Sequence, residues 1–311
     1  MGAGSFTAYA VRRLLTLLAV VVLTPSLTFV VFGATADSAS PWHRIAELPR
    51  YLHRTFVELD FGVTGPVTQP EAISHLVLTG MPVDLALLAG GLILGAGVGL
   101  ITGTFAGAHR RGTVDRLLGV GSAAGLSFPV FWLGFVVIVF VSPESGRWQL
   151  PFVSGAGEYV APGQDPLGWL HAMWVPWVVL AVPLAAMVHR MLRATLPEVL
   201  GDDHLRTARA KGLRERTVLV KHALPLALPP VLALISVNVA LLLANVILIE
   251  PTFNLPGAFR RADVGQFMGE QSHIPPVDIV QPLIVEAALI VALTMLVCDL
   301  LHAKLDPRVR A

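Results

Sequence analysis

One polar stretch, from Met191 to Pro225, holds most of the side chains that could act on another macromolecule. It carries eight basic residues when Arg190 at its edge is included. Asp202 or Asp203 fits the N-cap position of a helix, and Gly212 fits the left-handed position that ends one. Small alanines between these ends keep the helix slim enough to enter a groove, while arginines and a lysine supply cationic contacts. The pattern therefore predicts a helix–turn–helix that lies on the membrane surface and could enter a groove.

Two carboxylates lie in or beside strongly apolar stretches, where a charge is costly and usually faces a partner or a water-filled cavity. Glu286 lies roughly two turns inside the last apolar stretch. It could contact a peptide amine or another cationic cargo, or it could form a buried pair or hydrogen bond at a subunit interface, and the sequence leaves both open. Glu250 follows the preceding apolar stretch, where we favour a structural or gating role over cargo binding.

The residue pattern argues against several other kinds of chemistry. Three lysines, Lys211, Lys221 and Lys304, are followed by Gly, His and Leu, so none completes the Gly-Lys-Ser/Thr phosphate loop of an ATPase. The ten histidines are scattered, without an HExxH motif or a close cluster that would indicate a metal site. Ser127 and His189 fall in different regions, which disfavours an intramembrane protease. We therefore expect a chain that is not an enzyme and holds no metal or cofactor.

The elements that must position these residues are membrane helices. Of 311 residues, 54% are hydrophobic and 14% are charged, and the mean hydropathy is +0.70, whereas an ordinary soluble domain carries about 25% charged residues. A membrane helix needs roughly 20 mainly apolar residues. Six stretches qualify, which predicts an all-α, polytopic membrane protein with six transmembrane helices at about 12–33, 84–107, 117–141, 170–190, 227–250 and 279–302.

The basic residues predict how these spans are oriented. With a cytoplasmic N-terminus, 16 Lys and Arg side chains fall inside and 6 outside, and an even number of spans returns the C-terminus to the cytoplasm. The first span resembles a secretory signal, but its apolar run is longer than a usual signal core, so we expect it to remain as an anchor. The predicted organisation is an anchor helix at 1–33, an extracytoplasmic loop at 34–83, and a core of five helices at 84–311 that contains the inner loop 191–225.

Glycines recur every four residues along the second span. At this spacing they fall near one face of a helix, where the missing side chains let another backbone approach closely. We therefore predict a helix-packing face, with pore lining as an unsupported alternative, made of Gly91, Gly95, Gly99, Gly103 and Gly107.

The inner loop resembles the EAA loop of permease subunits of ATP-binding-cassette importers. That pattern is Glu-Ala-Ala, three residues, Gly, nine residues, then Ile-x-Leu-Pro. The matching positions here are Ala208, Gly212, Leu224 and Pro225, while Arg206, Thr207 and His222 replace Glu, Ala and Ile. The substituted string is similar to the branch that imports dipeptides, oligopeptides and nickel chelates.

The resemblance extends from about residue 60 to 310. Further matching stretches are Leu59 to Gly62, Leu126 to Gly134, Glu250 to Gly257 and Leu305 to Arg310. The chain departs from the family at Leu226, which stands where Asn is usual, at Phe259, which replaces a glycine, and at 33–55, which shows no clear match. These departures affect loop detail and the shape of the outer vestibule.

The resemblance implies a type I importer permease fold and a pore subunit of an ATP-driven, binding-protein-dependent importer in the bacterial cytoplasmic (inner) membrane. Its implied partners are a homologous second permease, two cytoplasmic ATPase subunits or one fused ATPase, an extracytoplasmic solute-binding protein and membrane lipid, with no nucleic acid. ATP and Mg would bind the ATPase subunits. The cargo would be a di- or oligopeptide or a peptide-like solute, and its identity is left open.

The resemblance also assigns residues to roles. The implied ATPase-coupling residues are Arg206, Thr207, Ala208, Arg209, Ala210, Lys211, Gly212, Leu213, Leu224 and Pro225. The candidate pathway or gate residues are Glu250, Phe253, Pro256, Gly257 and Glu286. The alternative function is an ion- or proton-driven secondary transporter or channel that acts alone, and copurification with ATPases would distinguish the two.

Overall fold

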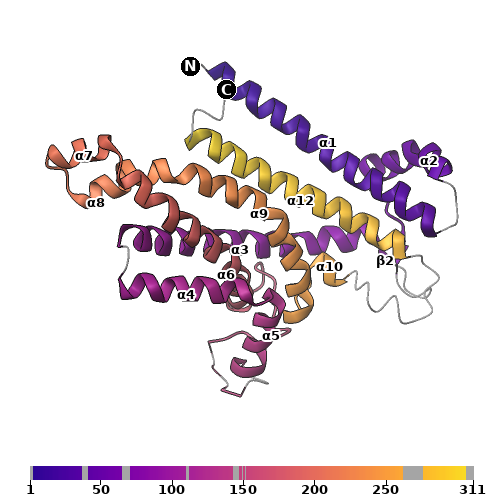
Figure 1. The fold of residues 1–311 in the computed structure, drawn as a ribbon. Coiled ribbons are helices and arrows are strands. Elements are labelled where there is room, and N and C mark those ends of the chain that lie inside the picture. The colour runs from indigo at the N-terminus through magenta and orange to yellow at the C-terminus, as the bar shows by residue number, and fades with distance from the viewer. Residues whose placement is uncertain are drawn as a thin grey trace. The chain divides into compact units, whose positions relative to one another are not determined.

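The structure is a computed structural model, and it describes residues 3–36, 41–64, 71–109, 112–142, 147–148, 150, 152–261 and 276–305. The matching ending beyond Leu305 lies outside these residues. The elements, drawn in Figure 1, are α1 (Ala3–Ala36), α2 (Pro41–His53), η1 (Arg54–Glu58), β1 (Val63–Thr64), β2 (Glu71–Ala72), α3 (Ile73–Ala108), α4 (Thr113–Ser127), α5 (Val130–Val141), α6 (Pro166–Leu200), α7 (Asp203–Ala210), α8 (Glu215–Thr217), η2 (Val218–Ala223), α9 (Leu224–Phe253), α10 (Ala258–Arg261) and α12 (Pro276–Leu305).

The helical membrane fold predicted from the sequence is confirmed. Over the described residues, five helices are long and apolar enough to cross a membrane, and a bent pair brings the number to six if it counts as one span. The one described strand pairing is a short antiparallel ladder in which Val63 faces Ala72 and Thr64 faces Glu71. Several helices extend beyond their predicted spans, and α3 begins at Ile73, eleven residues before the predicted start.

The third predicted span, 117–141, is broken. α4 and α5 meet at an angle of 101°, and the residues between them, Phe128 and Pro129, are both extended. A proline disfavours the α-helical conformation of the residue before it, and it lacks the N–H that would continue the helical hydrogen bonds. The break therefore follows directly from the Phe128-Pro129 pair inside the matched Leu126 to Gly134 stretch.

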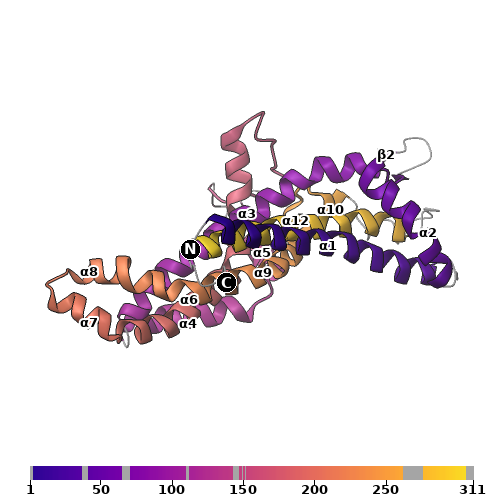
Figure 2. The same ribbon diagram turned by 90° about the horizontal axis from the view of Figure 1, so that it is seen from above.

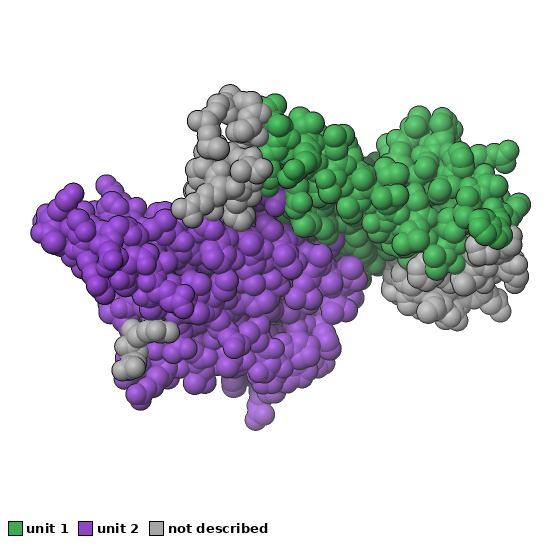
Figure 3. All heavy atoms as spheres, turned by 45° about the horizontal axis from the view of Figure 1, so that its top comes forward, with its two compact units in different colours: residues 1–86, 254–296 green, residues 87–253, 297–311 purple. Residues whose placement is uncertain are grey.

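The chain divides into two compact units, coloured separately in Figure 3. Unit 1 comprises 1–86 and 254–296, and unit 2 comprises 87–253 and 297–311. In unit 1, α2 packs on α1 through stacked rings of Phe29 and Tyr51, 4.2 Å apart. Tyr51 donates to the Gln281 side chain of α12, and burial raises the pKa of its hydroxyl. The segment after the first helix, 41–58, is thus ordered against apolar helices.

Unit 2 is built around α6 and α9, which lie side by side, with α4 and α5 against them. α7 and α8 extend from one end of this bundle in both ribbon views (Figures 1 and 2). Arg193 of α6 forms a bidentate ion pair with the buried carboxylate of Asp115 on α4. The Asp115 pair ties the two helices together near the end that carries α7.

Candidate functional site

The loop within 191–225 folds as the helix–turn–helix that its sequence indicates. α7 spans Asp203–Ala210, with Asp202 in the extended N-cap conformation. Leu205 is fully buried, as is Val218 of η2, and α7 packs on η2. The opposite face is exposed and carries Arg206, Thr207, Ala210, Lys211 and Leu213. The loop therefore anchors itself through Leu205 and leaves a cationic face open.

Gly212 closes the first helix in a left-handed conformation, with φ of +78°. Its N–H donates to the Arg209 carbonyl at 2.9 Å, and the Leu213 N–H donates to the Ala208 carbonyl at 3.3 Å. These two bonds form the Schellman arrangement, which satisfies carbonyls at a helix end. A Cβ at this position would meet nothing within 4 Å. Glycine is therefore favoured here by backbone conformation and not by lack of space.

Arg209 forms hydrogen bonds within the loop. Its Nε and Nη2 donate to the Glu215 carboxylate at 3.0 and 2.8 Å, and its Nη1 donates to the Leu200 carbonyl at 3.1 Å. The hydrogen bonds with Glu215 raise the pKa of the guanidinium. This side chain thus connects the end of α6, the end of α7 and the start of α8. The sequence pattern did not identify Glu215 as a member of the site.

The second half of the loop runs into the next span without a break. α8, the wider π-turns of η2 and α9 form one helical rod from Glu215 to Phe253. Leu224 and Pro225 lie at the start of α9, where Leu224 is half-buried and Pro225 is exposed. Pro225 has no N–H to donate, and it lies where the hydrogen-bond pattern changes from the π-turns of η2 to the α-helix of α9. The second half of the loop and the span are therefore parts of one continuous helical rod.

The glycine series of α3 faces α6. A Cβ added to each glycine would lie only 2.6 to 3.1 Å from the Cβ of one residue of α6. The facing pairs, in order, are Gly91 and Leu180, Gly95 and Leu184, Gly99 and Val188, Gly103 and Leu192, and Gly107 and Leu196. Both series advance by four residues, so α3 and α6 stay in close contact from Gly91 to Gly107. The geometry is that of close helix packing.

The pathway candidates fall in different parts of the chain. Glu250 and Phe253 lie at the end of α9 in unit 2, and both are buried. The Phe253 ring lies against Gly134 of α5, where an added Cβ would be 2.9 Å from it, and the Phe253 carbonyl accepts the Gly157 N–H. Asn254, with φ of +55°, then ends the helix. Phe253 is therefore a packing residue in this conformation.

Pro256 and Gly257 belong to unit 1, in the segment 255–261 that follows α9. Arg261 fastens this segment, because its Nε donates to the Pro256 carbonyl at 2.9 Å and its Nη1 donates to Thr79 of α3 at 3.0 Å. Ala258 is fully buried in an apolar cluster with Ile73, Leu76, Val77 and Leu283. The segment is thus held against the first half of α3.

A buried acidic pair lies at the same place. Asp84 of α3 accepts the Ala258 N–H at 3.1 Å, and its charge acts on the carboxyl of Glu286 on α12. The two side chains are 0% and 1% exposed. Sequence reasoning identified Glu286 but missed Asp84, because the charge-free run begins one residue later. The apolar Leu76 and Val77 before it were the signal that the helix starts earlier.

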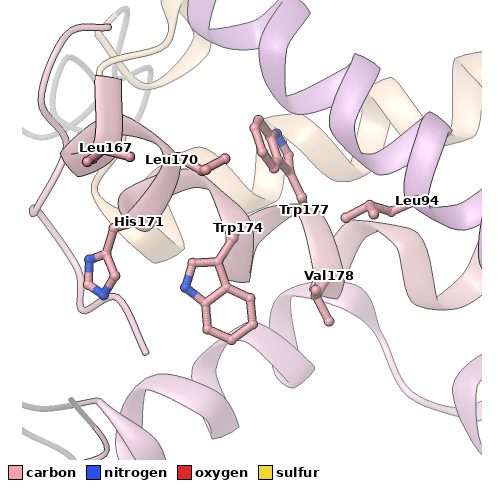
Figure 4. A pocket seen from close by; sticks show the side chains of 7 residues that line it. All are labelled: Leu94, Leu167, Leu170, His171, Trp174, Trp177 and Val178. Carbon is pink, nitrogen blue, oxygen red and sulfur yellow. The ribbon is translucent and has the colours of Figure 1, made fainter. Parts of the chain in front are cut away.

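An open apolar groove lies on α6 of unit 2. Figure 4 shows Leu167, Leu170, His171, Trp174, Trp177 and Val178 of α6 along it, with Leu94 of α3. Trp174 donates its indole N–H to the Phe152 carbonyl, so its polar atom is satisfied. In the described part of the chain, no group of three His, Cys, Asp or Glu side chains could hold a metal ion. The groove offers apolar surface and no catalytic constellation.

Comparison with known proteins identifies what this arrangement is similar to. A family model described as the binding-protein-dependent transport system inner membrane component matches residues 95–311. A protein of Sinorhizobium fredii named probable peptide ABC transporter permease is 34% identical over 244 residues, 75% of this chain and 74% of the relative. The dipeptide transport system permease of Haemophilus influenzae is 29% identical over 82% and 78%. A glutathione transport system permease of Pectobacterium atrosepticum is 32% identical over 79% and 72%.

Proposed function

Because this chain belongs to the family of inner-membrane components of binding-protein-dependent transport systems, we propose that it forms part of the transmembrane pathway of an ATP-driven peptide importer. Membership makes it a multi-pass inner-membrane permease subunit, which is not itself an enzyme and works with a solute-binding protein and an ATPase. The finer assignments of cargo, coupling residues, stoichiometry and orientation belong to the proposal.

The observation that carries the proposal is the exposed face of α7. Arg206, Thr207 and Lys211 project from a short helix whose other face is anchored by fully buried Leu205. A helix held in this way can enter a groove on an ATPase as a rigid body. Cationic side chains on its outer face favour an acidic groove wall.

Transmission to the membrane follows from the connections of α7. Arg209 links it to the Leu200 carbonyl at the end of α6 and to Glu215 at the start of the α8–η2–α9 rod. Motion imposed on the loop by closure of the ATPases is therefore passed to two spans at once. Leu213, Leu224 and Pro225 lie on the route between them. Glu250 and Phe253, at the far end of α9, would register that motion on the opposite side of the membrane.

The cargo class follows from the relatives. The three named above are permeases of peptide, dipeptide and glutathione transport systems, so we propose a di- or oligopeptide or a peptide-like solute. The complete importer would contain a homologous second permease and two ATPase subunits or one fused ATPase, which bind ATP and Mg. The excess of basic residues inside, 16 against 6, supports cytoplasmic termini.

Reconstitution tests the whole proposal. The chain is expressed alone, with a partner permease, and with the ATPase subunits and binding protein, and peptide uptake into proteoliposomes is measured with and without ATP. Uptake that requires every component and ATP is expected. Ion-driven uptake by this chain alone would overturn the proposal in favour of a secondary transporter.

Orientation has a separate test because the chain has one cysteine, Cys298. In a Cys298→Ser background, a cysteine placed at exposed Lys211 should react with an impermeant thiol reagent only in inverted vesicles. One placed at exposed Trp148 should react in intact cells. The reverse pattern would show that the orientation is wrong.

A further inference from the structure

In unit 1, α2 turns back along α1 instead of continuing away from it. The Tyr51 ring of α2 stacks on Phe29 of α1, and the Tyr51 hydroxyl donates to Gln281 of α12 at 3.0 Å. Both partners lie near the end of an apolar span, since these spans run over Thr7–Val31 and Val280–Leu300. The segment after α1 therefore enters unit 1 beside the ends of two membrane helices.

η1 continues this path to the middle of the same two spans. Its Phe56 side chain packs against a buried cluster of Leu17, Val21 and Ala292. Leu17 and Val21 flank the midpoint of the α1 span, and Ala292 lies close to that of the α12 span. A helix rises about 1.5 Å per residue, so the roughly ten residues from the end of a span to its midpoint correspond to about 15 Å of depth.

The chain then returns to the end of the spans at which it entered. Leu59 turns it in a left-handed conformation, with φ of +52°. Phe61 packs on the apolar cluster that contains Leu283, near the start of the α12 span. The Ile73 N–H at the start of α3 donates to the Gly62 carbonyl at 3.0 Å. The segment 41–62 is thus a hairpin that goes in and comes out on one side.

The exposed face of this hairpin carries charges beside Phe56. Four exposed residues, His53, Arg54, Val57 and Glu58, recur at a spacing of one and four, which places them on one helical face. Arg54 Nη2 lies 2.8 Å from Asp60 Oδ2, and His53 Nδ1 lies 3.0 Å from Glu58 Oε1. The side chains in these two contacts are 49–61% exposed, so a polar face lies at the depth of apolar spans.

Hydrocarbon is an unfavourable neighbour for such a face. Ionisable side chains at membrane depth are costly and face a water-filled cavity or protein, and pairing two charges does not remove the cost of taking both from water. The opposite charges are already matched within the hairpin, so they require no counter-charge from another chain. Their half-exposed atoms retain hydrogen-bonding capacity that water supplies.

We propose that residues 53–60 line a water-filled cavity that reaches the middle of the membrane and belongs to the transport pathway. The place in the pathway rests on the function proposed above. Charges of both signs on the cavity wall suit a peptide, whose two ends carry an ammonium and a carboxylate. The hairpin is then a lining of the pathway and not a loop at its mouth.

The test measures how fast single cysteines react with charged methanethiosulfonates, one cationic and one anionic, in open membrane fragments that expose both membrane faces. The assembled transporter carries Cys298→Ser. Val57→Cys places a thiol on the charged face without removing a charge. Leu18→Cys is the matched control, because Leu18 is exposed in this chain at the depth of the same cluster. Trp42→Cys, at the exposed start of α2, reports on a thiol in contact with water.

Val57→Cys should react with both reagents about 100-fold faster than Leu18→Cys, since the reactive thiolate forms in contact with water. Its rate should approach that of Trp42→Cys. Equally slow reaction of Val57→Cys and Leu18→Cys would show that lipid or a partner chain covers the face, which overturns the proposal. Fast reaction of Leu18→Cys as well would show that this part of α1 lies outside the membrane, which also overturns it.

Peptide uptake separates the cavity from the pathway. Modification at Val57→Cys should abolish ATP-dependent uptake by the complete transporter in proteoliposomes, whereas modification at Trp42→Cys should leave it. Uptake that survives complete modification at Val57→Cys would remove the cavity from the pathway. If the unmodified transporter shows no ATP-dependent uptake, the proposed function fails, while the labelling rates still decide whether the cavity exists.

Wild-type transporter gives a second measurement if the variants do not assemble. Hydroxyl radicals produced from water by a brief X-ray pulse oxidise the side chains next to that water, and mass spectrometry locates the oxidised residues. Val57 and Leu59 should be oxidised, and Leu15 and Leu18 of α1 should be spared, although all four are exposed in this chain. Equally low oxidation of the two pairs would overturn the proposal.

Discussion

The Ala258 N–H donates to the Asp84 carboxylate over 3.1 Å, across 174 residues of sequence. This bond closes the segment after α9 onto α3, and Gly80 makes it possible. A Cβ at Gly80 would lie 2.3 Å from the Ala258 nitrogen, which is closer than any non-bonded contact allows. The missing side chain therefore sets the distance at which the segment docks.

Gly80→Ala should displace this segment. The methyl group would meet backbone atoms of Ala258, which cannot rotate away, so we expect a loss of about 1–3 kcal/mol, as for overpacking elsewhere. The measurement is thermal unfolding of the purified complex together with protease sensitivity after Pro256. Gly97→Ala is the matched control, because a Cβ there meets nothing within 4 Å. Equal behaviour of the two variants would refute the close-approach argument.

Substitutions of Gly212 can separate the effect of its left-handed backbone conformation on coupling from the effect of side-chain size. Gly212→Val should impair ATP-dependent uptake, since a β-branched residue in the left-handed region costs at least about 1–2 kcal/mol. Gly212→Asn should retain most uptake, because asparagine adopts this conformation more readily and the site has room for a side chain. Uptake and ATP hydrolysis are measured in the same proteoliposomes. If both variants fail equally, the conformation of the turn is not what matters.

Arg209 and Glu215 should act as one unit. Glu215 is exposed and Arg209 about one third exposed, so we expect only about 0–1 kcal/mol of stability from the pair. Coupling should suffer more, because Arg209 also holds the end of α6. A double-mutant cycle with Arg209→Ala and Glu215→Ala is read in uptake per ATP hydrolysed. Strongly non-additive effects are expected, and additive ones would show that Arg209 and Glu215 act independently of each other.

The sequence predicted the helical membrane fold because charge-free runs of about 20 residues have few alternatives in lipid. The sequence did not predict how far the helices continue beyond their apolar runs. Because α3 starts at Ile73, Asp84 lies inside the helix. The boundary drawn from the charge pattern alone had placed Asp84 at the end of the helix. The break at Pro129 was visible as a proline, but its angle depends on packing of α5 against α9.

Within the loop, the turn at Gly212 could be read from local chemistry, since glycine at a helix end has a specific backbone reason. The direction of Arg209 could not. Its pairing with Glu215 and the Leu200 carbonyl depends on how α6, α7 and α8 meet, and a basic residue in a basic loop carries no sign of that. Long-range partners of this kind are set by tertiary packing.

The glycine face of α3 gives a final prediction about assembly. Gly99→Val would put a side chain 2.6 Å from the Val188 Cβ and 2.8 Å from the Ala185 carbonyl oxygen, so α3 and α6 must separate. Gly97→Val places the same residue on the same helix with nothing within 4 Å of its Cβ, which controls for the change in composition and helix propensity.

We expect Gly99→Val to lower the yield of monodisperse complex and to destabilise the complex by about 1–3 kcal/mol. Gly97→Val should remain near wild type in size-exclusion chromatography and in thermal unfolding. A destabilised Gly97→Val beside an unaffected Gly99→Val would place the packing face on the wrong side of the helix. The four-residue register makes the prediction sharper, because Gly95→Val and Gly103→Val should behave like Gly99→Val, each against its own neighbour on α6.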